Sequence, residues 1–239
     1  MNNTGYISLS RQAATRRQME IIANNIANAS TPGFRAERLM FAEYVGKGAG
    51  VERMSFVQDV GMVRDLREGQ VEETGNPLDL AIKGEGYFAV KFEDEILYTR
   101  NGRFRLDDAG QIVNALGALL LDEKDRPINV GKESTKLEIA RDGTVVTQEG
   151  EVGRIRVVRF ENEQALTRVD GGHLRTDQSP QSTEDALVIQ SSLEGSNVRP
   201  IVEITNMIDA LRSYQNAQQM VTNEHDRVLK TIESLTRAS

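Results

Sequence analysis

The sequence predicts an α+β fold in which helices at the amino and carboxyl ends pair as a coiled-coil-like bundle, with an antiparallel β domain inserted between them. Apolar residues recur every three or four positions at both ends of the chain, as they do along one face of a helix. Between Leu78 and Phe160 the apolar period changes to two, and turn-forming pairs such as Asn101-Gly102 recur. This pattern is typical of short antiparallel strands.

Residues 1–34 predict a helix followed by a tight turn. Between about residues 4 and 30 the larger apolar side chains recur at helical steps: Met19, Ile22, Ile26 and Ala29. Pro32 lacks an amide hydrogen and Gly33 accepts a positive φ, so the helix should stop there. Phe34 would then anchor the turn, and alanines along the helix would let a second helix approach closely.

The middle of the chain predicts a β domain at 76–165, flanked by two less regular segments. Residues 35–75 predict an extended linker or small subdomain, and the loop-rich residues 166–195 predict a return linker. The inward-facing positions of the strands should be Phe88, Val90, Phe92, Phe104, Leu106, Leu137, Ile139, Ile155 and Val157. Strands this short favour a meander, open barrel or sandwich over parallel α/β units.

Residues 196–239 predict a second, long helix. Ser196 or Asn197 can cap it, and Pro200 suits its first turn. Two adjacent rows step by three and four: one starts with Met207, Ala210, Tyr214 and Ala217, and the other with Ile204, Ile208 and Leu211. Such rows are typical of a coiled coil, and the helix is longer than its own core requires. One seam would remain for further copies of the chain.

Composition excludes several functional classes. The net charge is −7 and the pI is about 5.1, so the chain lacks the basic field that attracts nucleic acid. It has no cysteine, which excludes disulfides and thiolate sites. No apolar run approaches the roughly 20 residues of a membrane-spanning helix, and no cleavable signal sequence is recognisable. We expect neither a nucleic-acid partner nor a direct membrane span.

Candidate catalytic and metal-binding residues are few. His173 and His225 have no second histidine or cysteine at ligand spacing, and no GxSxG motif occurs. We expect His173 to be a solvated loop residue and His225 to lie in the helical seam. The acidic turn at 107–110 lacks the alternating ligands of a calcium loop and predicts a hairpin turn. We therefore expect no metal, no cofactor and no enzymatic activity.

Three asparagines near the end of the first helix, Asn24, Asn25 and Asn28, are unusual. Because asparagine is a poor helix former, three of them cost roughly 1.5 kcal/mol relative to alanine. Their amides could fix the register of a neighbouring helix, or they could cap loose backbone where the helix frays. The sequence favours neither interpretation.

Four stretches resemble the flagellar rod, hook and hook-associated axial protein family. They are ANNIANASTPGFRAE at 23–37, TGNPLDLAIKGEGYFAV at 74–90, YTRNGRFRLDDAGQIVNALGALLL at 98–121, and SSLEGSNVRPIVEITNMIDALRSYQNAQQM at 191–220. They occur in the family's order and cover most of the chain. The single inserted β domain is similar to that of rod members, the proximal member above all. Ile26 stands where the family often has leucine.

The resemblance implies a structural subunit of the bacterial flagellar basal-body rod, assembling helically to transmit torque from motor to hook. The terminal helices would be axial, and the β domain would face outward. Partners would be other copies, neighbouring rod proteins and the type III export apparatus, which would export the chain without a cleaved signal peptide. The implied signature and interface residues are Asn24, Asn25, Ala27, Asn28, Thr31, Gly33, Phe34, Glu194, Gly195, Ser196, Asn197, Val198, Ile204, Ile208, Leu211 and Tyr214.

Two other functions fit the same pattern. A distal rod or hook-like axial subunit would differ in position and copy number, not in chemistry. A soluble β-domain binding module with a dimeric coiled coil would form a stable, discrete dimer with fully helical ends. An enzyme would need a pocket with convergent polar groups, and the sequence locates none.

Overall fold

The computed structural model describes residues 3–46, 54–131, 137–183 and 186–237. The chain forms two compact units. Unit 1 is Met1–Ala27, Glu37–Asp65 and Arg199–Ser239, and unit 2 is Asn28–Ala36 and Leu66–Val198. Each unit therefore combines segments that are far apart in the sequence, and the chain passes between the two units four times. No helix within the described ranges is both long and apolar enough to cross a membrane.

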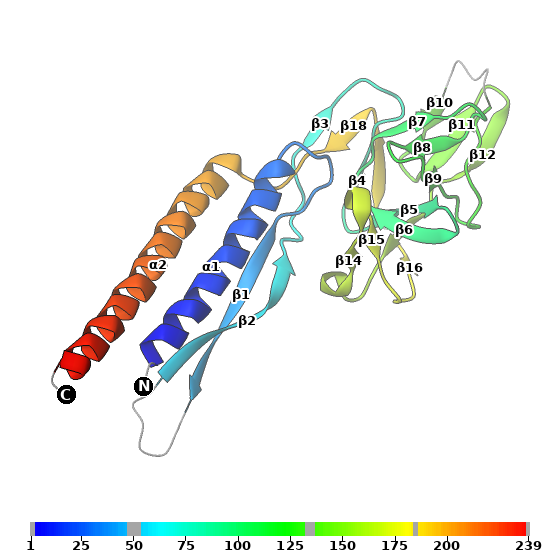
Figure 1. Cartoon of the computed structure of the whole chain (residues 1–239). Coiled ribbons are helices and arrows are strands. Elements are labelled where there is room, and N and C mark those ends of the chain that lie inside the picture. The colour runs from blue at the N-terminus through cyan, green and yellow to red at the C-terminus, as the bar shows by residue number, and fades with distance from the viewer. Residues whose placement is uncertain (1–2, 47–53, 132–136, 184–185, 238–239) are drawn as a thin grey trace. The chain divides into compact units, whose positions relative to one another are not determined.

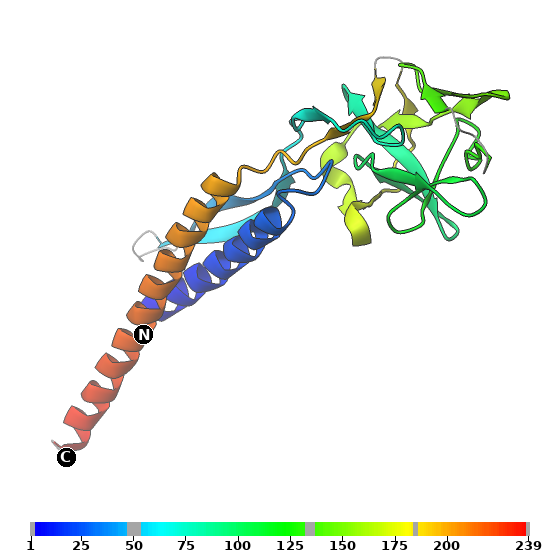
Figure 2. The ribbon, with the colours of Figure 1, turned by 90° about the horizontal axis from the view of Figure 1, so that it is seen from above.

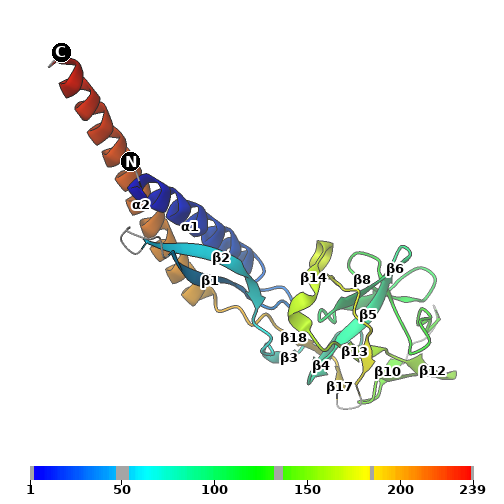
Figure 3. The same cartoon turned by 90° about the horizontal axis from the view of Figure 1, so that it is seen from below.

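The described part of unit 1 consists of two helices and a hairpin. Helices α1 (Asn3–Ala27) and α2 (Pro200–Arg237) lie side by side and run in opposite directions (Figure 1). The carboxy-terminal part of α2 continues past the beginning of α1 (Figures 2 and 3). Strands β1 (Glu37–Gly46) and β2 (Met54–Arg64) pair in an antiparallel hairpin beside α1, with a bulge at Met40/Phe41. This hairpin occupies much of the segment 35–75.

Helix α1 ends earlier than predicted, and helix α2 lacks its predicted cap. Helix α1 ends at Ala27, and the chain turns at once, because the Thr31 amide donates to the Asn28 carbonyl at 3.1 Å. Helix α2 begins at Pro200, in agreement with its predicted place in the first turn. The prediction that Ser196 or Asn197 caps α2 is wrong, because Arg199 directly precedes the helix and the Asn197 amide binds other backbone groups.

The largest sheet of unit 2 is antiparallel in every pairing, as the sequence predicts. Its strands run β14-β15-β6-β5-β9-β8-β7, while β13 pairs with both β5 and β16. Their bounds are β5 (Tyr87–Phe92), β6 (Glu95–Thr99), β7 (Phe104–Leu106), β8 (Ile112–Asn114), β9 (Leu119–Leu120), β13 (Val157–Arg159), β14 (Thr167–Arg168), β15 (Leu174–Arg175) and β16 (Gln181–Ser182).

In the described part of unit 2, smaller antiparallel sheets and two short 3₁₀ helices accompany this sheet. The three sheets are β10 (Leu137–Ile139), β11 (Thr144–Thr147) and β12 (Gly150–Arg154); β4 (Leu80–Lys83) and β17 (Leu187–Gln190); and β3 (Val71–Glu73) and β18 (Ser192–Glu194). The 3₁₀ helices are η1 (Glu163–Ala165) and η2 (Asp170–Gly172). The β7–β8 connection at 107–110 is a hairpin turn, as predicted, since Asp107 Oδ1 accepts from the amides of Ala109 and Gln111.

The core of unit 2 lies on both faces of β5. One face carries Phe88 and Val90, and the Phe88 ring meets Phe104 edge-on at 5.5 Å between centroids. The other face carries Tyr87 and Ala89, which belong to a second buried cluster. The prediction of a half-buried strand is therefore wrong for β5, because side chains distant in sequence cover its second face. Phe92, predicted to face inward, is 38% exposed.

Candidate functional site

The amino-terminal turn binds the strand that leads back to α2. The Gly33 amide donates to the Glu194 carbonyl at 2.8 Å. The Ala36 amide donates to Asn197 Oδ1 at 2.7 Å, and the Asn197 amide donates to the Phe34 carbonyl at 3.2 Å. These bonds join residues more than 150 positions apart, so two stretches that the sequence singles out separately form one structure within unit 2.

A third segment completes this arrangement. Asn197 Nδ2 donates to the Arg67 carbonyl at 2.8 Å, and the Gly195 amide donates to the Gln70 carbonyl at 2.8 Å. The Gly69 amide donates to Glu194 Oε1 at 3.1 Å. We call residues 31–36, 67–70 and 194–198 the junction. All three segments through which the chain enters or leaves unit 2 meet there.

Two glycines allow the junction to pack closely, Gly33 against Arg100 and Gly69 against Gly195. Gly33 has φ +68°, and a Cβ atom there would lie 2.4 Å from the carbonyl carbon of Arg100. A Cβ atom at Gly69 would lie 1.9 Å from the carbonyl oxygen of Gly195. Since real Cβ atoms do not come this close to backbone atoms, a side chain at Gly33 would force the turn away from Arg100, and one at Gly69 would force residues 67–70 away from 194–198.

A buried ion pair lies behind the junction. Arg100 Nε donates to Glu194 Oε2 at 2.8 Å, and their side chains are only 1% and 2% exposed. Arg100 Nη1 also donates to the carbonyls of Gly84 and Gly86 at 2.9 and 2.8 Å, while Glu68 lies 3.8 Å from Nη2. Arg100 was not among the residues predicted from the sequence, because 94 positions separate it from Glu194 and no local pattern connects them.

The turn residue Phe34 is held by contacts from the β14 region. The Arg168 guanidinium lies 4.3 Å from the centroid of the Phe34 ring, and Arg168 Nη2 donates to the Arg35 carbonyl at 3.2 Å. Arg35 is itself buried, and its Nη1 donates to Glu163 Oε2 at 3.3 Å. The Tyr87 hydroxyl donates to the same carboxylate oxygen at 2.6 Å. Phe34 thus anchors the turn, as expected, and the buried Arg35 anchors it as well through its bond to Glu163.

The asparagines of α1 have different environments. Asn25 is buried, and its Nδ2 donates to the Glu37 carbonyl at 2.9 Å while its Oδ1 accepts from the Glu37 amide at 3.0 Å. Asn24 and Ala27 are exposed, and Asn28 Oδ1 accepts from Thr31 Oγ1 at 3.2 Å. The helix does not fray at Asn24. Asn25 instead satisfies both backbone groups of the first residue of β1.

Replacing Asn25 by alanine should loosen the start of β1. The change takes these partners from the Glu37 amide and carbonyl, which lie in a partly buried place, so we expect a loss of about 1–3 kcal/mol from unit 1. The exposed Asn24→Ala variant, which makes the same chemical change one position earlier, should stay within about 0.5 kcal/mol of the parent. Urea unfolding monitored by far-ultraviolet circular dichroism compares them. Equal losses in the two variants would contradict this role for Asn25.

Helix α2 packs against α1 with one row of residues and leaves the other exposed. Ala210 and Ala217 are buried, and Met207 and Tyr214 are partly buried. We call the exposed row the α2 stripe, and its members have exposed fractions of 46–82%: Ile201, Ile204, Ile208 and Leu211. A row of four aliphatic side chains facing solvent on one helix face is a contiguous apolar surface.

The expectation that His173 is solvated is wrong. It is only 2% exposed, its Nε2 lies 2.6 Å from Asn114 Nδ2, and its Nδ1 lies 3.0 Å from the Asp170 carbonyl oxygen. Burial lowers the pKa of His173 below its usual value, and the bond to Asp170 partly offsets this. No local pattern signals this burial, since residues from other elements cover the ring. His225, in α2, is exposed.

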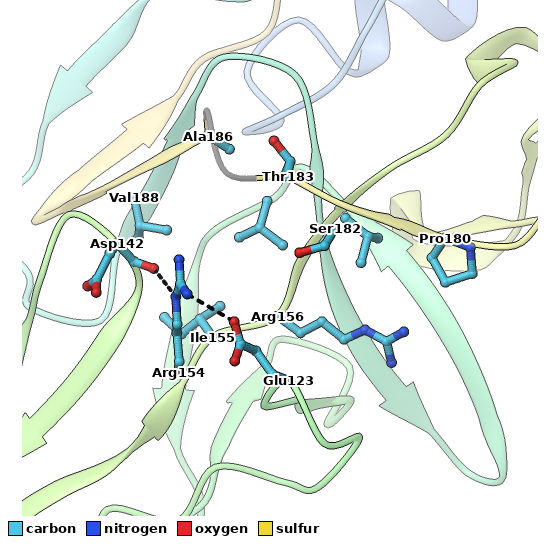
Figure 4. A pocket seen from close by; sticks show the side chains of 12 residues that line it. Glu123, Asp142, Arg154, Ile155, Arg156, Pro180, Ser182, Thr183, Ala186 and Val188 are labelled. Carbon is cyan, nitrogen blue, oxygen red and sulfur yellow. Dashed lines mark hydrogen bonds and ion pairs between the residues drawn. The ribbon is translucent and has the colours of Figure 1, made fainter.

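A pocket of about 350 Å³ opens in unit 2 (Figure 4). Arg154 Nε donates to the Asp142 carbonyl at 2.7 Å, and its Nη1 lies 3.2 Å from Glu123 Oε1. The hydroxyl groups of Ser182 and Thr183 also line the pocket, but neither histidine does. Arg154 is thus paired with Glu123 inside the pocket, Arg156 pairs with Asp125 outside it, and the two hydroxyl groups have no histidine base. Across the described ranges, no three His, Cys, Asp or Glu residues come close enough to hold a metal ion.

Three family models match successive parts of the chain. "Flagella basal body rod protein" matches residues 6–35, which include the end of α1 and the turn of the junction. "Flagellar hook protein FlgE/F/G D1 domain" matches 81–147 in unit 2. "Flagellar basal body rod FlgEFG protein C-terminal" matches 189–234, from β17 through most of α2. The matched segments contain most of the junction and the whole α2 stripe.

Curated relatives match the chain over nearly its whole length. A flagellar basal-body rod protein FlgF of Caulobacter vibrioides is 37% identical over 98% of both chains. A FlgF of Mesorhizobium japonicum is 30% identical over 98% of this chain and 99% of its own. A flagellar basal-body rod protein FlgG of Buchnera aphidicola is 30% identical over 96% of this chain and 98% of its own.

Proposed function

The chain belongs to the FlgF family of flagellar basal-body rod proteins, and from this premise we propose how its surfaces build a rod. It is a structural subunit of the bacterial flagellar rod. We propose that the subunit assembles helically with further copies and with neighbouring rod proteins, and that the assembly transmits torque from motor to hook. The observation that carries this proposal is the exposed α2 stripe.

The α2 stripe supports a contact between subunits. Four aliphatic side chains on one face of α2 remain 46–82% exposed among the residues that the structure describes, although the neighbouring row packs on α1. Covering them removes apolar surface from water, which contributes about 25 cal/mol for each Å². In a rod of repeated subunits, the helices of the next subunit are the natural cover. A contact between two different faces of the chain repeats without closing, as a filament requires.

The pairing of α1 with α2 would be coiled-coil-like. Ala210 and Ala217 are both buried and lie seven positions apart, which is the heptad spacing. Tyr214 lies between them and is partly buried. These terminal helices would form the inner, axial part of the rod, with the β domain facing outward. In this arrangement the exposed Asn24 and the turn residue Asn28 would set the register between adjacent copies.

The remaining signature residues would hold the subunit together. The junction contains Thr31, Gly33, Phe34, Glu194, Gly195, Ser196, Asn197 and Val198, and backbone and side-chain bonds connect its three segments. No catalytic step is needed for a structural role, and we propose none and no cofactor. We further propose export by the flagellar type III apparatus without a cleaved signal peptide, and residence in the periplasm-spanning rod.

Charging the α2 stripe tests the proposal. Leu211→Asp should reduce incorporation into purified basal bodies at least tenfold, because burying an unpaired carboxylate costs several kcal/mol and 1.4 kcal/mol already gives a factor of ten. Asn206→Asp is the matched control, since Asn206 is exposed and lies about 200° around the helix from Ile204. The host is a strain lacking the native gene, and motility is scored alongside incorporation.

Two outcomes of this experiment decide between assembly and a folding defect. The Leu211→Asp protein should keep the circular dichroism spectrum of its parent, because Leu211 is 46% exposed in the single chain. Normal incorporation and motility of this variant would contradict the stripe as a contact surface. Equal loss in Asn206→Asp would show that any charge on α2 interferes, which would also overturn the assignment.

A distal position in the rod is the second candidate. It is favoured by the match to FlgG of Buchnera aphidicola at 30% identity, against 37% for FlgF of Caulobacter vibrioides. The higher identity supports the proximal, FlgF position. Expression of the chain in strains that lack either protein distinguishes the two, since only the strain missing the equivalent subunit should recover its rod.

A further inference from the structure

The two ring nitrogens of His173 have fixed hydrogen-bonding roles. Asn114 Oδ1 already accepts from the amides of Leu116 at 3.0 Å and Ala118 at 2.9 Å, so the Asn114 amide group must present its Nδ2 donor to His173. His173 Nε2, 2.6 Å away, must then accept. His173 Nδ1 faces the Asp170 carbonyl at 3.0 Å and must donate. Only the neutral ring with its proton on Nδ1 satisfies both bonds.

We propose that His173 is a pH-sensitive latch that holds the β14–β15 hairpin and, through Arg168, the amino-terminal turn of the junction. A second proton on Nε2 would turn that acceptor into a donor facing the Asn114 amide donor. The contact would become repulsive, and the hairpin would lose its attachment to β8. Nothing in this proposal depends on the role of the chain in a rod.

The contacts from His173 lead directly to the turn. The Val169 amide donates to the His173 carbonyl at 2.9 Å, and Arg168 pairs with Leu174 in the register of β14 and β15. Arg168 then contacts both the Phe34 ring and the Arg35 carbonyl. Movement of the hairpin would therefore withdraw the cation that covers the Phe34 ring.

Uncharged groups surround the ring on each element packed against it. Phe92 of β5 stacks on it with 6.4 Å between centroids and an interplanar angle of 23°. Beside it, the β8–β9 turn places the Leu116 side chain close to Gly171 of η2. The charged residues of these elements pair with groups other than the ring: Lys91 lies 3.9 Å from Asp94, and Arg175 pairs with Glu95. Asp170 contacts the ring through its backbone carbonyl.

The direction of the pH effect follows from burial. Burial lowers the pKa of His173 below the ordinary value of 6.5, and no charged side chain contributes to the shift. The latched form therefore takes up its proton at lower pH than the open form. The equilibrium constant that favours the latched hairpin over the open one has its full value above about pH 6.5. It falls as the pH drops below that value, by at most tenfold per pH unit for one proton.

Hydrogen exchange on the full chain measures the latch. Between pH 7.5 and 5.0, after correction for intrinsic exchange, protection of the Val169 and Gly33 amides should fall severalfold relative to the Ile112 amide, which donates to the Ile128 carbonyl inside the core. His173→Gln should abolish this pH dependence, since the glutamine side-chain oxygen can accept from Asn114 and does not titrate. His225→Gln removes the only other histidine and should leave the dependence intact.

A second measurement on the parent chain covers the case in which His173→Gln does not fold. Nitrogen chemical shifts of the ring should show Nε2 unprotonated at neutral pH, and the ring should titrate with a midpoint below 6.5. A midpoint at or above 6.5, or a proton on Nε2 at neutral pH, would overturn the latch. Protection of Val169 and Gly33 that stays constant with pH, or a dependence that survives in His173→Gln, would overturn it equally.

Discussion

Replacing Arg100 by methionine should destabilise unit 2 by about 3–5 kcal/mol, because it leaves the Glu194 carboxylate buried without its cation. The methionine fills much of the same volume, so the loss reports charge and hydrogen bonds more than a cavity. The carbonyls of Gly84 and Gly86 lose their donor at the same time. In urea the midpoint should fall by roughly 1–3 M. The methyl signals of Leu80 and Ile82, buried in unit 2, monitor the transition.

Two further variants separate the ion pair from a general effect of losing arginine. Arg103→Met, three positions along the chain and exposed, should change stability by less than about 0.5 kcal/mol. In the double variant Arg100→Met/Glu194→Met, the second change should cost less than it does alone, because no unpaired carboxylate remains. Strict additivity of the two changes, or an Arg100→Met loss no larger than that of Arg103→Met, would contradict the role assigned to the pair.

Replacing Gly33 by alanine should be comparably damaging, for two reasons that can be separated. The first is the positive φ of Gly33, which costs an alanine about 1–2 kcal/mol. The second is steric, because the new Cβ atom would lie 2.4 Å from the Arg100 carbonyl carbon. Relief of that contact requires movement of the turn and loss of its bond to the Glu194 carbonyl. We expect a total loss of about 3 kcal/mol or more, in the range of strongly destabilising substitutions.

Gly75→Ala isolates the first contribution. Gly75 has φ +76°, close to the +68° of Gly33, yet nothing lies within 4 Å of the position of its Cβ atom. Its substitution should therefore cost the conformational contribution alone. The difference between the two variants in urea unfolding measures the close packing of the turn on Arg100. If both alanines cost the same, the turn is not packed as tightly as these distances require.

The elements that follow from local pattern were predictable from the sequence. Apolar spacing predicted both helices, and the turn residues at 107–110 predicted their hairpin. Pro200 stands in the first turn of α2 because a missing amide is harmless there. Each of these depends on neighbours within a few positions. The antiparallel pairing in unit 2 followed for the same reason, since short strands and short turns allow little else.

Features that depend on distant partners were not predictable. The local sequence around His173 predicts a solvated loop histidine. In the structure, Phe92 and Asn114, which lies 59 positions away, cover the ring. Asn197 is of a residue type that often caps helices, yet its side-chain amide binds backbone groups of two segments that lie more than 100 positions earlier. At the candidate site, sequence patterns located the turn and the return strand separately. Arg100, which lies behind both, has no local signature at all.

The junction sets the spacing of the segments that connect unit 2 to the rest of the chain, whereas the hairpin turns elsewhere in unit 2 can vary in length. Because residues 31–36, 67–70 and 194–198 are bonded to one another, the distances between the three segments through which the chain enters and leaves unit 2 are set there. Hairpin turns elsewhere in unit 2, such as the exposed Glu93–Asp94 pair between β5 and β6, have no part in that spacing. Length added at such a turn changes the size of the β unit but not the separation of its attachment points. The same turn is therefore a suitable place for an epitope or a fluorescent label.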